Sequence, residues 1–292
     1  MIGDEVRIAS AALSATIAPL GAELQTLGDA DGRDLLWNGD PAYWTGRAPL
    51  LFPFIGRLNG DAYRLDGVSH PLGQHGFARR RNFALVEQAP ARALFRLTDD
   101  EETRALYPFA FELDADYRID GATLTMTITA RNTGDRPLPA SFGYHPAFRW
   151  PLPYGAARED HRILFEKDEP APLRVLAGGL ASPELVPSPV EGRSLPLTDT
   201  LFARDAMIWD RLESRQLLYG AGDGPQLDIR FPDMPWLGIW TKPGAGYVCI
   251  EPWAGMADPE GFEGEVWEKP GIIAIEPGGE RSFRMIVTLT GL

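Results

Sequence analysis

The sequence predicts an all-β protein, a large sandwich or barrel of antiparallel strands with very little helix. Apolar and polar residues alternate through much of the chain, as where threonines separate Leu124, Met126 and Ile128. A period of two is typical of strands that bury one face. The 31 glycines and 26 prolines are spread along the chain, which favours many turns between short elements. These observations together predict many short strands around one hydrophobic core.

In chain order, the first clear element is a hairpin, in which Asp66 and Gly67 separate residues 63–65 from Val68. One helix of about two turns is expected from Asp99 to Tyr107. Thr98 opens this helix with Glu101 three residues later, and Pro108 stops it.

The central strand over residues 123–130 ends at a turn signal in residues 132–135. The proline-rich stretch 171–196 is irregular, and we interpret it as long loops on the sandwich rather than as a domain boundary. The last strand follows from the alternation of Phe283, Met285, Val287 and Leu289. Because no repeat or linker interrupts the chain, we expect one domain over residues 1–292.

Composition excludes several classes of function. The formal net charge of -13 repels phosphate backbones and anionic membranes, so we expect no nucleic-acid and no membrane partner. Cys249 is the only cysteine, which rules out an intrachain disulfide and fits a reducing compartment. Residues 1–6 lack the basic and apolar regions of a secretory signal, and no apolar run approaches the roughly 18 residues of a membrane span. We therefore expect a cytoplasmic protein.

Two of the four histidines have unusual neighbours. His75 and His145 are flanked by aromatic residues and glycine, which suits a concave site where backbone approaches a ligand. A packed histidine with satisfied hydrogen bonds is the alternative for both. The same alternative is favoured for His70 and His161, which lack such neighbours.

Glu251 is the most conspicuous carboxylate. It ends the apolar strand 247–250 and is followed by Pro252 and Trp253. A charge at the end of a buried strand is costly unless it is paired or used, and burial near Trp253 raises a carboxyl pKa toward the range of a general base. A salt-bridged carboxylate is the alternative. Glu276 looks similar, but we interpret it as the start of an ordinary turn.

Arginine and tryptophan supply further candidates. Arg57 follows an aromatic run and could bind sugar hydroxyls or an anion through its fork of donors. Residues 79–81 are consecutive arginines, of which at most two share a face of a strand, and a solvated basic edge is the favoured interpretation. Most of the eight tryptophans belong in the core. Trp240 and Trp253 are the better candidates for an aromatic wall against the apolar face of a sugar ring.

Motifs for metals and cofactors are missing. His75, His145 and Glu251 could form a site with two histidines and one carboxylate, but the local His-x-His or His-x-Asp spacing is absent. The chain also lacks a Gly-x-Gly-x-x-Gly turn, a P-loop and a Gly-x-Ser-x-Gly elbow. We expect no metal ion and no cofactor.

Seven segments in order resemble the aldose 1-epimerase (galactose mutarotase) family, and within it the bacterial LacX-type branch. The resemblance covers nearly the whole chain. Its segments are residues 17–24, 53–58, 74–79, 103–109, 143–148, 205–208 and 249–255.

The resemblance implies a large antiparallel β-supersandwich with an open sugar cleft, and an enzyme that interconverts the α and β anomers of an aldohexose. By position, His145 matches the general acid of the family and Glu251 its general base. His75, Arg57 and Asp205 match residues that hold the sugar hydroxyls and ring oxygen, with Asp210 as the alternative to Asp205. A sugar is the expected partner, and a homodimer is one option for the assembly.

The chain also departs from the classical galactose mutarotases. Gly56 precedes Arg57 where those enzymes carry an asparagine, and the segment around His75 is compact. The compact segment is similar to the hexose-6-phosphate epimerase branch, so the choice between a free and a phosphorylated sugar stays open.

Two other functions compete with an epimerase. A glycoside hydrolase needs two carboxylates on either side of the scissile bond, and Glu251 with Asp205 could be that pair, but the histidines would then be idle. A non-catalytic sugar-binding protein could use the same cleft. A candidate acid and a candidate base together favour the enzyme, because binding alone needs neither.

Overall fold

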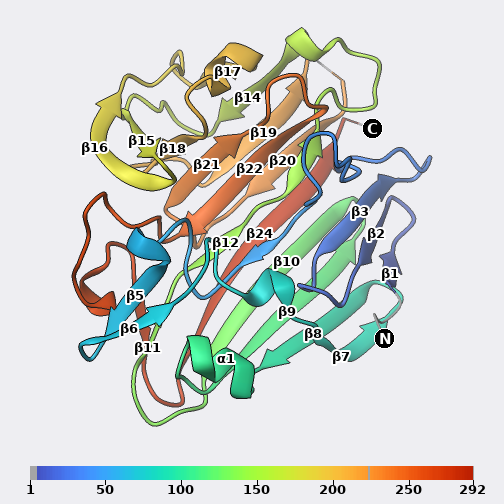
Figure 1. The fold of residues 1–292 in the computed structure, drawn as a ribbon. Coiled ribbons are helices and arrows are strands. Elements are labelled where there is room, and N and C mark those ends of the chain that lie inside the picture. Colours follow the sequence, from blue (N-terminus) through green and yellow to red (C-terminus); the bar gives the residue numbers. More distant parts are fainter. Residues whose placement is uncertain (1–4, 223, 292) are drawn as a thin grey trace.

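Two large antiparallel sheets form the body of the protein (Figure 1). The computed structural model describes residues 5–222 and 224–291, so residues 1–4, on which part of the expectation about a secretory signal rests, lie outside it. In the described residues one sheet has nine strands, in the order β17 (Ser194–Pro196), β14 (His161–Phe165), β19 (Gln216–Ala221), β20 (Gln226–Arg230), β24 (Glu280–Thr290), β10 (Thr123–Asn132), β9 (Phe111–Asp120), β8 (Arg92–Thr98) and β7 (Ala84–Ala89).

The second sheet carries the functional candidates. Its order is β16 (Leu180–Val186), β15 (Leu173–Ala177), β18 (Met207–Trp209), β21 (Trp236–Trp240), β22 (Tyr247–Ala254), β12 (Phe142–Tyr144) and β4 (Leu50–Leu51), with β13 (Ala147–Arg149) also paired to β22. Three small sheets complete the fold: β1–β2–β3 (Val6–Ala9, Leu13–Ile17 and Leu24–Asp29), β5–β6 (Ala62–Leu65 and Val68–Pro71) and β11–β23 (Leu138–Ala140 and Ile273–Ile275).

The facing sides of the two sheets build the main core. In β10 the side chains of Leu124, Met126 and Ile128 are buried, while the threonines between them are partly exposed. β24 pairs beside β10 and buries the alternating set Phe283, Met285, Val287 and Leu289. Both strand predictions are confirmed, and so is the all-β class.

The predicted hairpin is also confirmed. β5 and β6 pair in antiparallel register around Asp66 and Gly67, whose φ angles are 53° and 78°. Positive φ at both central residues is the geometry that matches the right-handed twist of the two strands.

The helix is present but begins later than predicted. Helix α1 spans Glu101–Leu106, and Asp100 rather than Thr98 caps it. The Asp100 side chain accepts from the Thr103 backbone N–H at 2.7 Å, and the Thr103 hydroxyl accepts from the Asp100 N–H at 2.8 Å. A carboxylate competes well for this position because its oxygens satisfy the free N–H groups of the first turn. No helix in the described part of the chain is long and apolar enough to cross a membrane.

The proline-rich stretch 171–196 is more ordered than predicted. It contains β15, β16 and β17, so its interpretation as long loops is wrong. Gly178 and Gly179, with φ angles of 58° and 87°, turn the chain between β15 and β16. Pairing of Arg174 with Ile208 attaches this hairpin to the second sheet. Tertiary pairing thus overrides weak local strand patterning.

Candidate active site

Strand register places His145 directly opposite Glu251. β22 pairs with two consecutive strands, with β12 at Gly143↔Trp253 and with β13 at Ala147↔Cys249. The register is the same on both sides of the short gap between β12 and β13, and His145 lies in that gap. Directly opposed residues in antiparallel strands bring their side chains into contact.

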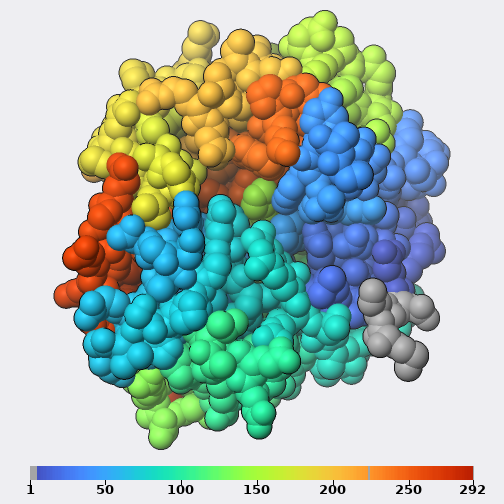
Figure 2. Space-filling model, in the orientation of Figure 1, coloured from blue at the N-terminus to red at the C-terminus, as the bar shows by residue number. Residues whose placement is uncertain are grey.

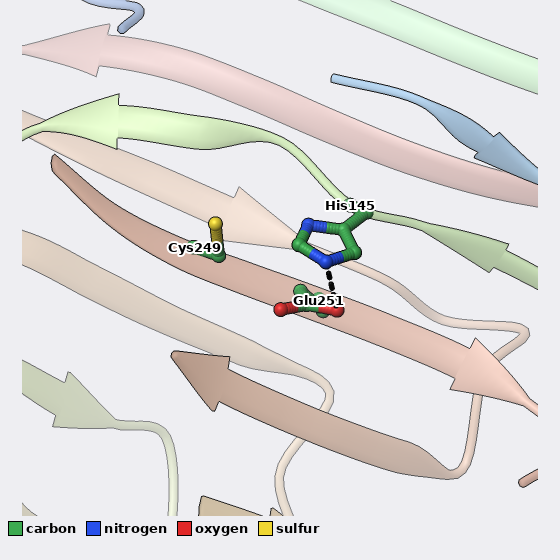
Figure 3. Close-up of side chains that lie close together, drawn as sticks. All are labelled: His145, Cys249 and Glu251. Carbon is green, nitrogen blue, oxygen red and sulfur yellow. Dashed lines mark ion pairs between the residues drawn. The ribbon is translucent and has the colours of Figure 1, made fainter. Parts of the chain in front are cut away.

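The two side chains meet on the side of the sheet that faces away from the main core. Along β22, Val248 and Ile250 belong to the main core, whereas Tyr247, Cys249 and Trp253 pack in two separate clusters on the other face. His145 Nε2 lies 3.3 Å from a carboxylate oxygen of Glu251 (Figure 3). From the sequence, Glu251 was expected at the end of a strand. This is wrong, because β22 continues to Ala254 and Glu251 lies well inside it.

His145 and Glu251 contribute to the wall of a cavity of about 340 Å³. Figure 2 shows a hollow near the middle of this face, where the yellow, orange and blue-cyan segments meet. The volume is at the small end of ligand sites and suits a single sugar ring. The other residues that line it are Trp44, Ile55, Gly56, Gln74, His75, Arg79, Arg174, Leu176, Gly179, Ala181, Asp205, Ala206, Ile208, Trp240, Trp253, Met256 and Ala257.

Aromatic rings enclose the acid–base pair. The Trp44 ring lies 4.8 Å from the His145 ring at 31°, and Trp240 meets His145 edge-on at 6.0 Å. Trp253 lies over two glycines: a Cβ on Gly143 or Gly238 would come within 2.6 Å of its indole. Two glycines therefore make room for one wall of the cavity.

His75 reaches the cavity through a strained turn. Its φ is 64°, which is uncommon for a residue with a side chain, and Gly76 follows at 69°. Gly76 passes so close to Phe52 that a Cβ would lie 2.2 Å from the Phe52 carbonyl oxygen. His75 Nδ1 accepts from the Gly56 N–H at 3.2 Å, and the rings of His75 and His145 are 5.9 Å apart. Strain held by such packing is common at binding sites.

The arginines are arranged differently from the expectation. Arg57 does not line the cavity in the described structure, because both ends of its guanidinium bind Asp61, at 2.9 and 3.0 Å. Arg79 lines it instead, from a short 3-10 turn over Ala78–Arg80. The interpretation of Arg79 as part of a solvated edge is wrong, since its Nε is buried and has no hydrogen-bond partner within the described chain.

The structure separates Asp205 from Asp210. Asp205 lines the cavity with a φ of 76°, another positive value at a residue other than glycine. Asp210 accepts from the Arg174 guanidinium at 2.6 and 2.8 Å and is not part of the lining. The neighbouring carboxylates thus have different roles: one faces the cavity, and the other orients an arginine.

A family model described as aldose 1-epimerase matches residues 4–288. The chain belongs to this family. The match covers nearly the whole chain, as the resemblance of the seven segments indicated.

The chain is similar to three known proteins over nearly its whole length. The chromosomal LacX protein of Lactococcus lactis subsp. lactis is 32% identical over 277 residues, which cover 91% of this chain and 92% of that protein. A galactose mutarotase related enzyme from Lactobacillus acidophilus has a similar structure, with a TM-score of 0.90, 30% identity, and coverage of 98% of this chain and 97% of that one. A galactose mutarotase-like protein from Lactobacillus casei gives 0.91 at 28% identity, covering 98% and 100%.

In this member of the aldose 1-epimerase family, burial shifts the pKa values of Glu251 and His145 in opposite directions. Loss of water, with a smaller contribution from the charge of Asp205, raises the pKa of Glu251 well above its usual range. Loss of water lowers the pKa of His145 to about 3, and Arg79 adds to this effect. Burial also lowers the pKa of His75, to which His145 and Arg79 contribute. Both members of the His145–Glu251 pair therefore favour their neutral forms.

Two residues of the cavity wall, Trp44 and Arg79, were not predicted from the sequence as site residues. Trp44 packs on His145, and its only local signal was an aromatic pair followed by Gly46. Arg79 carried a stronger signal, because it lies four residues after His75 in a matching segment. His75, Asp205, Trp240 and Trp253 all line the same cavity as His145 and Glu251.

Proposed function

We propose that the protein is an aldose 1-epimerase, which interconverts the α and β anomers of an aldohexose by opening and closing the sugar ring. The observation that carries this proposal is the buried His145–Glu251 pair at 3.3 Å in the wall of a cavity of sugar size. Ring opening needs one base and one acid close to C1. Sugar binding alone requires neither.

In the proposed reaction, Glu251 accepts the proton of the C1 hydroxyl. The C1–O5 bond breaks as the carbonyl forms, and O5 takes its proton from His145. The open-chain aldehyde then turns about the C1–C2 bond. On closure His145 takes the proton back from O5 as O5 attacks C1 from the other face, and Glu251 returns its proton to O1. Every proton is restored, and no oxidant or other reactant is needed.

The shifted pKa values of Glu251 and His145 support this sequence of steps. After ring opening Glu251 is protonated and His145 is neutral, and these are the forms that burial favours. The site is therefore matched to the open-chain intermediate. Contacts to the closed sugar must favour the ionised pair, and proton transfer then returns the site to its preferred state.

The remaining lining residues supply the contacts that orientation requires. The buried Trp253 Nε1 has no partner among the described residues and can donate to a sugar hydroxyl. Asp205 offers a carboxylate to hydroxyl donors, and His75, whose Nε2 lies 3.2 Å from the Gln74 side-chain amide, lines the cavity beside it. The Trp253 and Trp240 rings offer apolar surface to the sugar ring.

Polarimetry on freshly dissolved α-glucose and α-galactose tests this proposal. We expect the wild-type protein to accelerate mutarotation, and Glu251→Gln to lose at least about 10²-fold in turnover, because the amide keeps the shape but cannot act as a base. Glu276→Gln is the matched control: the same change at the similar carboxylate, which lies outside the cavity lining.

Full activity in Glu251→Gln would contradict the role of Glu251. Sugar binding by the wild type without acceleration would support a non-catalytic binding protein instead. Release of reducing sugar from an aryl glycoside would point to a glycoside hydrolase.

Arg79 favours one more specific candidate, a hexose-6-phosphate 1-epimerase. Its guanidinium lies in the cavity wall without an ion-pair partner in the described structure, while Arg57 and Arg174 are engaged by Asp61 and Asp210. A guanidinium that no carboxylate pairs is a good ligand for a phosphoryl group.

Comparison of glucose with glucose 6-phosphate tests this candidate. If Arg79 binds the phosphoryl group, Arg79→Gln should raise KM for the phosphosugar by about 10- to 100-fold, as expected for a hydrogen bond to a charged group, and leave KM for glucose nearly unchanged. Arg80→Gln is the control, because Arg80 is exposed and does not line the cavity. Equal effects on both sugars would exclude a phosphate contact by Arg79.

A further inference from the structure

Cys249 lies next to the acid–base pair and has no role in the proposed reaction. It is two residues before Glu251 in β22, so both side chains project from the same face of the strand. Figure 3 shows the thiol, the imidazole of His145 and the carboxylate of Glu251 grouped on one side of β22. A ring nitrogen of His145, the sulfur of Cys249 and a carboxylate oxygen of Glu251 all lie within 4.8 Å of one another. All three residues are buried.

The spacing fits a tetrahedral metal ion. Zinc bonds are about 2.0–2.2 Å to nitrogen and oxygen and about 2.3 Å to sulfur, so two ligand atoms on one ion lie roughly 3.3–3.6 Å apart. The observed 3.3 Å between His145 Nε2 and the Glu251 carboxylate already meets this value. The sulfur would have to approach by up to roughly 1.2–1.5 Å, which is within the reach of side-chain rotation.

We propose that His145, Cys249 and Glu251 form a binding site for a thiophilic divalent cation of the zinc class, and that this ion inhibits the enzyme by occupying its acid and its base. The donor set of imidazole, thiolate and carboxylate is one that zinc prefers over magnesium or calcium, which favour oxygen alone. Three protein ligands leave a fourth position, and the cavity can fill it with water because His145 and Glu251 both line it.

The charges around the cluster mostly favour a cation. Within the described chain no lysine or arginine pairs with Glu251, and Asp205 adds a negative charge nearby. Arg79 acts against the ion, since its positive charge is felt at His145. Arg174 is neutralised by Asp210.

One missing contact indicates an inhibitor rather than a permanent cofactor. Histidines that hold zinc firmly donate their second ring N–H to an acceptor, and such contacts strengthen binding by about 10- to 100-fold. His145 Nδ1 is buried and has no partner among the described residues. We therefore expect weak, reversible binding, and the reaction itself still needs no metal.

Cobalt provides a spectroscopic test that does not depend on activity. Co²⁺ bound by a thiolate gives a sulfur-to-metal charge-transfer band in the near ultraviolet, and the chain has only one cysteine, so such a band reports Cys249. We expect a saturable band in the wild type that zinc abolishes by competition. Glu251→Gln and His145→Gln should each weaken cobalt binding by at least about tenfold. His70→Gln, at a histidine outside the cavity lining, should not.

The absence of a thiolate band at saturating cobalt would overturn the site. A band that persists with unchanged affinity in both Glu251→Gln and His145→Gln would place the ion elsewhere and overturn it as well. Circular dichroism of each variant shows that lost binding does not reflect lost folding.

Inhibition is the second arm, and it rests on the proposed function. Zinc should slow mutarotation by the wild type, a chelator should restore it, and Cys249→Ser should need at least about tenfold more zinc for the same inhibition. Equal zinc sensitivity in Cys249→Ser would contradict the inhibition mechanism. If the protein shows no mutarotation, the proposed function fails, and the cobalt spectra alone decide the site.

Discussion

At the scale of single residues, the site depends on taking two ionisable groups out of water. Glu251 is 2% exposed and His145 is 9% exposed, and burial shifts the pKa of each. The residue types were evident in the sequence. Loss of water sets the direction of both shifts, and a cavity wall that brings Asp205 and Arg79 close to the pair adds to them.

Asp205 should tune the alkaline limb of the pH profile. Its charge raises the pKa of Glu251, so removal of that charge lowers this pKa and lets the pair lose its proton at lower pH. In Asp205→Asn the fall of kcat/KM at high pH should therefore begin at lower pH than in the wild type, whatever the change in the plateau. The measurement is the pH dependence of mutarotation, corrected for the buffer-catalysed rate.

Asp233→Asn serves as a control, because Asp233 pairs with Arg284 and is not part of the cavity lining. An alkaline limb that stays in place, or moves to higher pH, in Asp205→Asn would contradict the assigned effect of its charge.

At the scale of elements, β22 is the structural basis of the site. Its pairing with β12, β13 and β21 fixes Glu251 opposite His145 on one side and opposite Gly238 on the other. Alternation along the strand sends one set of side chains into the main core and the other to the opposite face, where Glu251 and Trp253 line the cavity. The sequence indicated a strand here. Its continuation through Pro252 and its three partners follow only from sheet pairing.

The two glycines beneath Trp253 should be intolerant of a side chain. In Gly143→Ala or Gly238→Ala, the new methyl group would lie 2.6 Å from the indole and displace it. We expect a loss of about 1–3 kcal/mol in the free energy of unfolding, the usual effect of overpacking, and weaker sugar binding. Urea denaturation and calorimetric titration with sugar measure the two effects.

Gly73→Ala is the matched control, since the only heavy atom near its added Cβ is a flexible arginine tip at 3.8 Å. Wild-type stability and wild-type sugar affinity in both Gly143→Ala and Gly238→Ala would show that the position of Trp253 is not restricted in this way.

At the scale of the whole molecule, folding buries His145 and His161 and partly buries His75, in forms that resist protonation. Burial lowers the pKa of His75, His145 and His161. His161 is bonded at both ring nitrogens, with Nδ1 2.9 Å from the Ala157 carbonyl and Nε2 accepting from the Leu152 N–H at 3.0 Å. Protonation of Nε2 would place its new hydrogen against the hydrogen of the Leu152 N–H and remove this hydrogen bond.

Stability should therefore fall on acidification, because the three histidines together outweigh Glu251, whose raised pKa acts in the opposite direction. A histidine with a lowered pKa in the folded state contributes its stabilisation above its unfolded pKa of about 6.5, and this contribution is lost as the pH falls from there toward the folded value. Each such group lowers the free energy of unfolding by up to about 1.4 kcal/mol per pH unit in that window. Urea unfolding of the wild type at several pH values from 7 to 5 measures the slope.

His161→Gln separates the structural histidine from the cavity pair. The variant lacks the titrating ring, so its stability should decline less steeply with falling pH than that of the wild type. Equal slopes would mean that His161 does not contribute, and a wild type that gains stability between pH 7 and pH 5 would contradict the linkage as a whole.

The sequence by itself determined the class of fold, the family and most of the candidate site residues. Alternation in residues 123–130 and 283–289 specifies half-buried strands, because the period of two is a local property of the backbone. The Asp66–Gly67 hairpin is equally local. Family segments with characteristic residues identified His145, Glu251 and the family itself.

Only the tertiary structure decided which of these residues meet. Strand 173–177 forms because partners far along the chain pair with it, and Arg57 is engaged by Asp61 instead of lining the cavity. The opposition of His145 and Glu251 comes from a register shared by β12 and β13 across a gap, and Cys249 joins them because it is on the same face of β22. Register, burial and cavity walls are non-local, since each depends on segments that are distant in sequence and adjacent only after the sheets have formed.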